Sequence, residues 1–265
     1  MLHSQYSVQR FNNDEIQIQL PFQNFHDHIL LFKKFFTDIH EEIFEILLVI
    51  IKCYEAGAKS VSLLLPYMPY SRNENLIYLY KLLSKVGVQT ITTVEIHQSV
   101  SFISSLNITS KIIHFCDFKD SIIVSPDLGG KNRVKQLAHI TKNQWLCMYK
   151  KRFENDIHHQ EIQNKCIRNK NVLLIDDIID SGKTILSATQ ILLNSGAKSV
   201  NVLAIHGVFS RNAIELLSES PIKKIYVTNS IIQPELPSKF HIINIDELII
   251  QMTINKQSLI LSKVI

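Results

Sequence analysis

Glycine and proline are scarce in this chain, which has 7 of each among its 265 residues. So low a content excludes collagen-like chains and the glycine- or proline-rich disordered classes. Apolar residues make up 46% of the sequence. The length suits one large or two medium-sized domains. We therefore expect a fully globular protein.

Cysteine is also scarce, and the four cysteines lie far apart in the sequence. Cys53, Cys116, Cys147 and Cys166 include no Cys-x-x-Cys pair. The spacing therefore suggests neither a zinc site nor a disulfide framework. Such usage is typical of proteins in a reducing compartment, and we expect a cytoplasmic protein.

Long hydrophobic runs and dense basic tracts are missing as well. The most apolar run, Ile46–Ile51, is far too short to span a bilayer. The first 20 residues contain polar and charged side chains throughout, so we expect no signal peptide. The net charge is +4, and the densest basic segments, residues 150–152 and 165–170, are too short to indicate a nucleic-acid surface. We expect neither a membrane nor a nucleic acid as partner.

The most informative stretch of the chain is Asn171–Thr184. Val172–Ile175 is a short apolar run typical of a strand that is buried on both faces. Asp176 and Asp177 follow it, and a helical pattern begins after Thr184. Backbone N–H groups at a helix N-terminus favour a phosphate, whereas carboxylates suit sugar hydroxyls and a hard cation. The stretch therefore predicts a site for a ribose 5-phosphate moiety held with magnesium.

Two other interpretations of this stretch are weaker. Gly182-Lys183-Thr184 looks like the end of a nucleoside-triphosphate P-loop, but that motif needs glycine where Asp177 stands. A plain strand-to-helix turn with solvated acids would not require three carboxylates in five residues ahead of a Ser-Gly-Lys-Thr ending. We favour the functional interpretation.

Strand and helix patterns alternate along the rest of the chain, which favours an α/β fold. The segment Gly57-Ala58-Lys59-Ser60-Val61 recurs 139 residues later as Gly196-Ala197-Lys198-Ser199-Val200. Each copy follows a helical pattern and precedes a buried strand. We therefore predict two similar domains with mainly parallel sheets flanked by helices, and we place them at residues 1–115 and 116–265.

Several segments, taken in order, resemble the ribose-phosphate diphosphokinases, also called phosphoribosyl diphosphate synthetases, which have a type I phosphoribosyltransferase-like fold. The Asn171–Thr184 loop alone is shared with the phosphoribosyltransferases. The family's other motifs are matched by Pro66–Asn73, Glu95-Ile96-His97, Ser125–Gly130, Lys150-Lys151-Arg152 and Ile205–Ser210. The resemblance covers nearly the whole chain from about Gln9.

This resemblance implies a role for each matching segment. Lys150 and Arg152 would be catalytic and would neutralise charge on the transferring diphosphoryl group. His97 and Asp127 would hold magnesium. Without the resemblance, His97 would more often be a histidine that caps a strand end, and Lys150 and Arg152 would more often belong to a solvated basic loop. Ribose 5-phosphate would be bound in the second domain by Asp176, Asp177, Asp180, Ser181, Gly182, Lys183 and Thr184. ATP would be bound on the side of the first domain by Phe11, Glu15, Arg72, Asn73 and His97.

The chain departs from the family pattern mainly in its nucleotide-binding segments. The family's Phe-x-Asp-Gly-Glu is Phe11-Asn12-Asn13-Asp14-Glu15 here, and its Arg-Gln-Asp-Arg is Arg72-Asn73-Glu74-Asn75. Glu95 replaces an aspartate, and Lys183 replaces a usual glycine. We therefore expect weaker binding of ATP than of ribose 5-phosphate.

Three functions are compatible with these residues. The first is a diphosphokinase that uses ATP, ribose 5-phosphate and Mg²⁺ and forms a homo-oligomer, dimer-based or hexameric, in which a neighbouring subunit supplies Phe11. The second is a non-catalytic or weakly active paralogue with a regulatory role, which the altered residues 72–75 favour. The third is a phosphoribosyltransferase, against which Lys150, Arg152, His97 and Asp127 argue.

Overall fold

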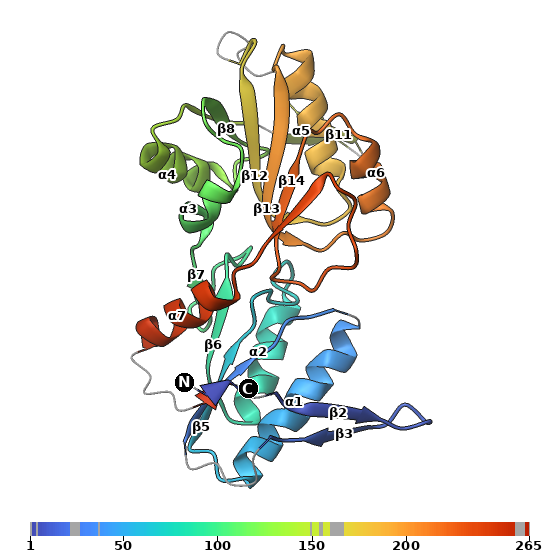
Figure 1. The fold of residues 1–265 in the computed structure, drawn as a ribbon, viewed down its shortest axis with the longest axis vertical. Coiled ribbons are helices and arrows are strands. Elements are labelled where there is room, and N and C mark those ends of the chain that lie inside the picture. The colour runs from blue at the N-terminus through green and yellow to red at the C-terminus, as the bar shows by residue number, and fades with distance from the viewer. Residues whose placement is uncertain are drawn as a thin grey trace. The chain divides into compact units, whose positions relative to one another are not determined.

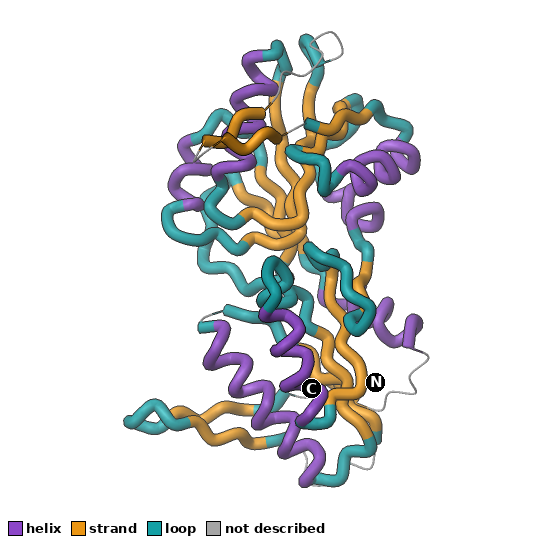
Figure 2. Tube along the Cα trace, turned by 180° about the vertical axis from the view of Figure 1, so that it is seen from behind, coloured by secondary structure: helices purple, strands orange, loops and turns teal. Residues whose placement is uncertain are grey.

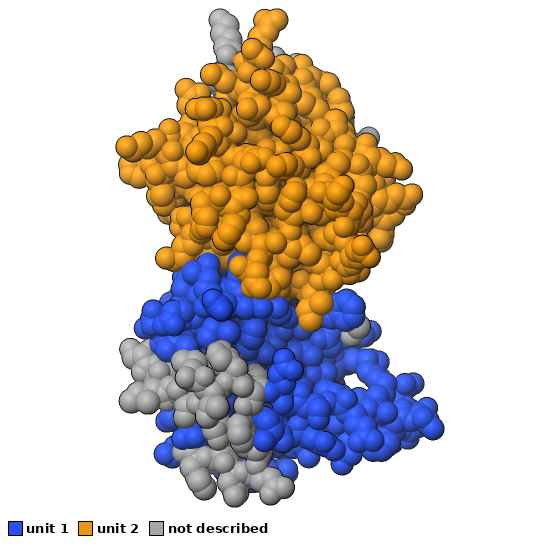
Figure 3. All heavy atoms as spheres, in the orientation of Figure 1, with its two compact units in different colours: residues 1–106, 245–265 blue, residues 107–244 orange. Residues whose placement is uncertain are grey.

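The computed structural model describes residues 2–3, 5–21, 27–36, 38–148, 150–153, 156–159, 167–257 and 263–264. The chain forms two compact units (Figures 1 and 3). Unit 1 comprises residues 1–106 and 245–265, and unit 2 comprises residues 107–244. Each unit has its own six-stranded sheet, and every strand pairing within these two sheets is parallel. The predicted α/β architecture with parallel sheets is confirmed.

Unit 1 contains the sheet β1-β16-β4-β5-β6-β7 and a separate antiparallel hairpin, β2–β3. Helices α1 and α2 lie side by side in both views (Figures 1 and 2). The elements are β1 (Leu2–His3), β2 (Ser7–Arg10), β3 (Ile16–Gln19), β4 (His28–Phe32), α1 (Ile39–Glu55), β5 (Ser60–Leu64), α2 (Asn75–Lys85), β6 (Val88–Val94), β7 (Ser104–Leu106), α7 (Asp246–Gln257) and β16 (Lys263–Val264).

Unit 2 contains the sheet β15-β14-β13-β12-β8-β9 and a second antiparallel hairpin, β10–β11. The elements are α3 (Thr109–Ile112), a 3₁₀ helix (Ile113–Phe115), β8 (Ser121–Ser125), α4 (Lys131–Thr141), β9 (Trp145–Cys147), β10 (Lys150–Phe153), β11 (Asp156–His159), β12 (Asn171–Ile179), α5 (Lys183–Asn194), β13 (Ser199–Gly207), α6 (Ala213–Glu219), β14 (Ile225–Thr228) and β15 (Phe240–Ile243).

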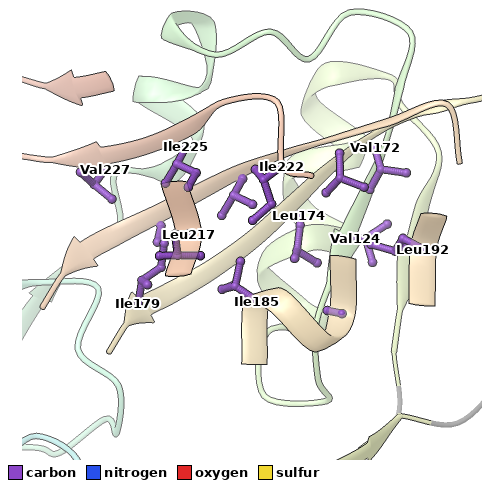
Figure 4. Close-up of a cluster of buried hydrophobic side chains, with 14 of the residues drawn as sticks. Val124, Val172, Leu174, Ile179, Ile185, Leu192, Leu217, Ile222, Ile225 and Val227 are labelled. Carbon is purple, nitrogen blue, oxygen red and sulfur yellow. The ribbon is translucent and has the colours of Figure 1, made fainter. Parts of the chain in front are cut away.

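One face of the unit 2 sheet carries the core on which the candidate site rests. Alternate residues of β12, such as Val172 and Leu174, meet Ile185 and Leu192 from α5 and Leu217 from α6 (Figure 4). All five are less than 2% exposed. Burying each such side chain contributes roughly 1.5–3 kcal/mol. This core fixes the position of α5 and therefore of its N-terminus.

The repeated Gly-Ala-Lys-Ser-Val segment forms the same helix-to-strand connection in both units. Gly57 and Gly196 each adopt a left-handed φ of 90°. Each glycine N–H donates to the carbonyl three residues back, and the N–H of the next residue, Ala58 or Ala197, donates to the carbonyl five residues back. This is the Schellman arrangement that ends a helix. The repeat therefore marks two equivalent places, α1–β5 and α5–β13.

The compact units differ from the expected division at residues 115 and 116. The first boundary lies between Leu106 and Asn107, and residues 245–265 cluster with unit 1. Strand β16 pairs with β1 and β4 there, and Lys34 Nζ lies 2.8 Å from Asp246 Oδ2. Parallel pairing thus joins strands from the two ends of the chain, and a local sequence pattern cannot predict such a pairing.

No helix among the described residues is long and apolar enough to cross a membrane.

Candidate active site

Strand β12 is longer than its apolar run predicts, and the two acids lie inside it. Its pairing with β8 ends at Leu174, whereas its pairing with β13 continues to Ile179. Asp176 and Asp177 therefore lie beyond the carboxyl end of β8, where one side of β12 is no longer covered by a strand. Ligands of open α/β sheets bind at the carboxyl ends of the strands.

The two carboxyl groups of this pair interact strongly. The backbone N–H of Asp177 donates to Asp176 Oδ1 at 2.9 Å. Burial raises the pKa of Asp176 well above its ordinary value, and the neighbouring charges of Asp177 and Asp127 raise it further. Two neighbouring carboxyl groups of this kind suit hydroxyl donors or a cation, which reduce the repulsion between like charges.

Arg133 on α4 supplies the cation next to this pair. Its Nη1 lies 3.8 Å from Asp177 Oδ1, and the two side chains are 17% and 11% exposed, respectively. The sequence analysis missed Arg133. The sequence did contain an indication of its role. Arg133 lies in the first turn of α4, where a positive charge opposes the helix dipole, so an acidic partner elsewhere in the fold is expected.

The turn from Ser125 to Gly130 presents Asp127 beside the acidic pair. Asp127 Oδ1 accepts hydrogen bonds from the N–H groups of Gly129 (2.9 Å) and Gly130 (3.4 Å). The Asp127 carbonyl accepts one from Ser125 Oγ at 2.7 Å. Any side chain at position 130 would collide with Ser125 Oγ. The turn therefore orients Asp127 by backbone geometry.

The loop after β12 leads directly into α5 and leaves its first turn open to an anion. Gly182 is the N-cap residue of α5 and adopts a left-handed φ of 76°. No side chain forms a capping hydrogen bond at this end, and the first turn of α5 contains no acidic residue. A Cβ at position 182 would lie 3.2 Å from Leu217 Cγ. Glycine is required there both for φ and for close packing on α6. Asp180, Ser181 and Thr184 are half-buried, and Lys183 is exposed.

Unit 1 has a cavity of about 400 Å³ that Arg72 and Asn73 help to line, together with Ile39, His40, Tyr67, Pro69, Tyr70 and Ser71. The rings of His40 and Tyr70 lie 6.1 Å apart between centroids. His40 and Tyr70 were not among the expected nucleotide-binding residues, and nothing in the spacing of α1 links His40 to residues 66–73. Asn73 Oδ1 accepts a hydrogen bond from the N–H of Asn75 at 2.9 Å.

Phe11 lies in the turn of the β2–β3 hairpin and is 45% exposed. Its N–H donates to Glu15 O at 2.9 Å, which closes the turn. Asp14, at the position of the family's glycine, adopts a left-handed φ of 64°. Arg10 Nη2 ties the hairpin to α1 through Glu41 Oε2 at 2.9 Å. The backbone of a glycine turn therefore persists here without the glycine.

Two family profiles match the chain. One, described as the N-terminal domain of ribose phosphate pyrophosphokinase, matches residues 1–78, and a phosphoribosyl synthetase-associated domain matches residues 165–259. A ribose-phosphate pyrophosphokinase of Corynebacterium ammoniagenes is 30% identical over 249 residues, which is 86% of this chain and 78% of the relative. One of Bacillus caldolyticus is 29% identical with the same coverage.

The chain belongs to the ribose-phosphate pyrophosphokinase family.

The fold agrees with this assignment. Phosphoribosylpyrophosphate synthetase from Mycobacterium smegmatis superposes with a TM-score of 0.84 at 21% identity, and the match covers 96% of this chain and 91% of that one. The predicted phosphoribosyltransferase-like architecture of both domains is confirmed. An ATP-using kinase family of this kind generally works with a divalent metal.

The predicted metal ligands of this pyrophosphokinase-family chain come from different units. His97 is exposed after β6 in unit 1, and Asp127 lies in unit 2. Just before His97, Glu95 is buried with a left-handed φ of 43°. Within the described part of the chain, no three His, Cys, Asp or Glu side chains are grouped closely enough to hold a metal. The pairing of His97 with Asp127 stays a prediction.

The two predicted catalytic residues of the family's basic loop lie in β10. The backbone of Lys150 pairs with that of His159, and the backbone of Arg152 with that of Ile157. Strands β10 and β11 thus pair as an antiparallel hairpin. The side chains of Lys150 and Arg152 lie outside the described part of the structure, so their role stays a prediction.

Proposed function

We propose that this protein is a ribose-phosphate diphosphokinase, which transfers the diphosphoryl group of ATP to the 1-hydroxyl of ribose 5-phosphate and releases AMP. One observation carries the proposal. A single loop joins the crowded pair Asp176–Asp177 to the open, glycine-capped N-terminus of α5. A sugar phosphate needs both features at this spacing, with carboxylates for the ring hydroxyls and N–H groups for the phosphate.

In this mechanism the acidic pair accepts hydrogen bonds from the ribose 2- and 3-hydroxyls, and the segment from Asp180 to Thr184 surrounds the 5-phosphate. Fixing the sugar at both ends aims its 1-hydroxyl at the β-phosphorus of ATP. The new oxygen–phosphorus bond forms as the bond to the oxygen bridging the α- and β-phosphorus breaks. The hydroxyl loses its proton, and the bridging oxygen departs with AMP.

Lys150 and Arg152 stabilise negative charge on the diphosphoryl group during transfer. The nucleotide itself is bound by Phe11, Glu15, Arg72, Asn73 and His97, and the unit 1 cavity beside Arg72 and Asn73 supports that side of the proposal.

Magnesium is the metal we infer, held by Asp127 and His97. The local chemistry of Asp127 fits a hard cation, because its Oδ1 is occupied by two N–H donors and no hydrogen bond or ion pair engages its Oδ2 among the described residues. When bound, magnesium supplies charge neutralisation on the ATP phosphates.

We also infer a homo-oligomer, dimer-based or hexameric, since Phe11 is half-exposed in a hairpin turn where a neighbouring subunit's nucleotide can meet it. Measurement of the mass in solution checks this. A cytoplasmic location fits the free thiols of Cys53, Cys116 and Cys147.

The decisive assay is AMP release from ATP that depends on both ribose 5-phosphate and magnesium. We expect release with wild-type protein and weaker ribose 5-phosphate binding in Asp177→Asn, since a hydrogen bond to a charged acceptor contributes about 1.5–3 kcal/mol. Ribose 5-phosphate binding without AMP release would instead favour the non-catalytic paralogue. The observation that supports this alternative is that Asn73 Oδ1 accepts a hydrogen bond from the N–H of Asn75. Binding of neither substrate would overturn the proposal.

A further inference from the structure

Arg133 occupies a position that its own helix does not explain. It is the third residue of α4, whose first turn contains no acidic side chain. A cation in that turn is disfavoured by the helix dipole. The guanidinium is nonetheless largely buried and lies 3.8 Å from Asp177. A reason for Arg133 therefore lies outside α4, and Asp177 on β12 is a charged neighbour with which it forms an ion pair.

The turn before α4 lies next to this guanidinium. Gly130 has no side chain because a Cβ would collide with Ser125 Oγ, and the same Cβ would lie 3.8 Å from Arg133 Nη1. Arg133 therefore lies between the turn that orients Asp127 and the strand that carries Asp176 and Asp177. Arg133 forms an ion pair with Asp177, one member of this group of acids.

Asp177 needs such a partner if it is to act as an ionised acceptor. Its side chain is only 11% exposed, and a buried carboxylate is costly unless it is paired. Asp176 beside it adds like charge, which makes ionisation of both acids harder. Arginine offers several N–H donors in a fixed plane, which suits it to orient a neighbouring carboxylate.

We propose that Arg133 is a positioning residue of the sugar-phosphate site, which holds the Asp177 carboxylate ionised and oriented toward the ribose hydroxyls. This inference rests on the proposed function of the loop. Arg133 acts through Asp177 and does not contact the substrate. Its loss should therefore weaken ribose 5-phosphate binding only where Asp177 is intact.

The first test compares Arg133→Met and Arg133→Lys with Lys135→Met, which removes the same charge from the exposed face of the same helix. Calorimetry with ribose 5-phosphate should show affinity reduced about tenfold or more in Arg133→Met, because the buried Asp177 carboxylate loses its neighbouring positive charge. Arg133→Lys should recover part of it, and Lys135→Met should match wild type. In steady-state assays the KM for ribose 5-phosphate should rise more than the KM for ATP.

The second test is a double-mutant cycle with Asp177→Asn, which separates positioning from direct contact. Arg133→Met should add almost nothing to the affinity loss of Asp177→Asn. An equal loss in both backgrounds would show that Arg133 contacts the ligand itself and would overturn the proposal. If Arg133→Met fails to fold, as judged by circular dichroism, the same cycle with Arg133→Lys decides the question.

Different outcomes test the proposed function and the role of Arg133. Wild-type protein that binds no ribose 5-phosphate would overturn the proposed function, and the role of Arg133 with it. Wild-type binding together with unchanged binding by Arg133→Met would overturn only the role of Arg133.

Discussion

Asn73 Oδ1 accepts a hydrogen bond from the backbone N–H of Asn75, the first residue of α2, at 2.9 Å. The family has glutamine at position 73, whose extra methylene disfavours this local bond. The Asn73 side chain, which we propose lies at the nucleotide site, here accepts from the backbone next to it, in the manner of short polar residues near helix starts. A sequence departure thus has a specific structural consequence beside the unit 1 cavity.

Asn73→Gln should therefore lower the stability of the fold and raise the affinity for the nucleotide. Loss of the local hydrogen bond should lower the free energy of unfolding by about 0.5–1.5 kcal/mol, and the longer side chain should lower the KM for ATP. Urea unfolding and steady-state kinetics measure the two effects. Asn73→Ala is the matched control, because it loses the same bond without gaining reach. Equal ATP kinetics in the two variants would contradict the prediction.

Gly182→Ala should abolish ribose 5-phosphate binding and destabilise unit 2. The left-handed φ of 76° costs a non-glycine residue about 1–2 kcal/mol, and the new Cβ would press on Leu217 at 3.2 Å. Adding Leu217→Val should remove the destabilisation that comes from the contact with Leu217 but not the destabilisation that comes from the left-handed φ. Thermal unfolding and calorimetry check both. Full recovery in the double variant would show that φ is not limiting.

Asp176→Asn should stabilise the protein at neutral pH while removing sugar binding. The pKa of Asp176 is raised in the folded state, so the folded protein retains a proton that the unfolded chain releases. The stability from this group is complete below the ordinary value of 3.8 and is lost as pH rises through the raised pKa. The variant's advantage over wild type in urea should therefore grow with pH. A constant difference from pH 4 to pH 8 would count against the raised pKa.

Lys150→Ala should lower turnover far more than it raises either Michaelis constant, because the charge acts mainly in the transition state. Comparable losses of one preorganised group cost on the order of 2.7–4 kcal/mol, or about 10²–10³ in rate. Lys151→Ala, the adjacent residue of the same type, is the control and should remain close to wild type. A change confined to substrate affinity would make Lys150 a binding residue.

Local patterns in the sequence determined the elements and the chemistry of the phosphate loop. The apolar run before Asp176 indicated a buried strand, and the helical pattern ending at Gly196 indicated α5, because strand and helix periodicities are short-range properties. The repeated glycine segment predicted equivalent connections for the same reason, and Gly57 and Gly196 share one φ.

The tertiary structure decided what depends on pairing between distant segments. Strand β12 continues to Ile179 because β13 pairs with it there, and residues 245–265 join unit 1 because β16 pairs with β4. Arg133 meets Asp177 although 43 residues separate them in the chain. A parallel sheet requires each strand to find a partner across an intervening crossover, so register and cross-element ion pairs depend on long-range packing that no local window of the sequence contains.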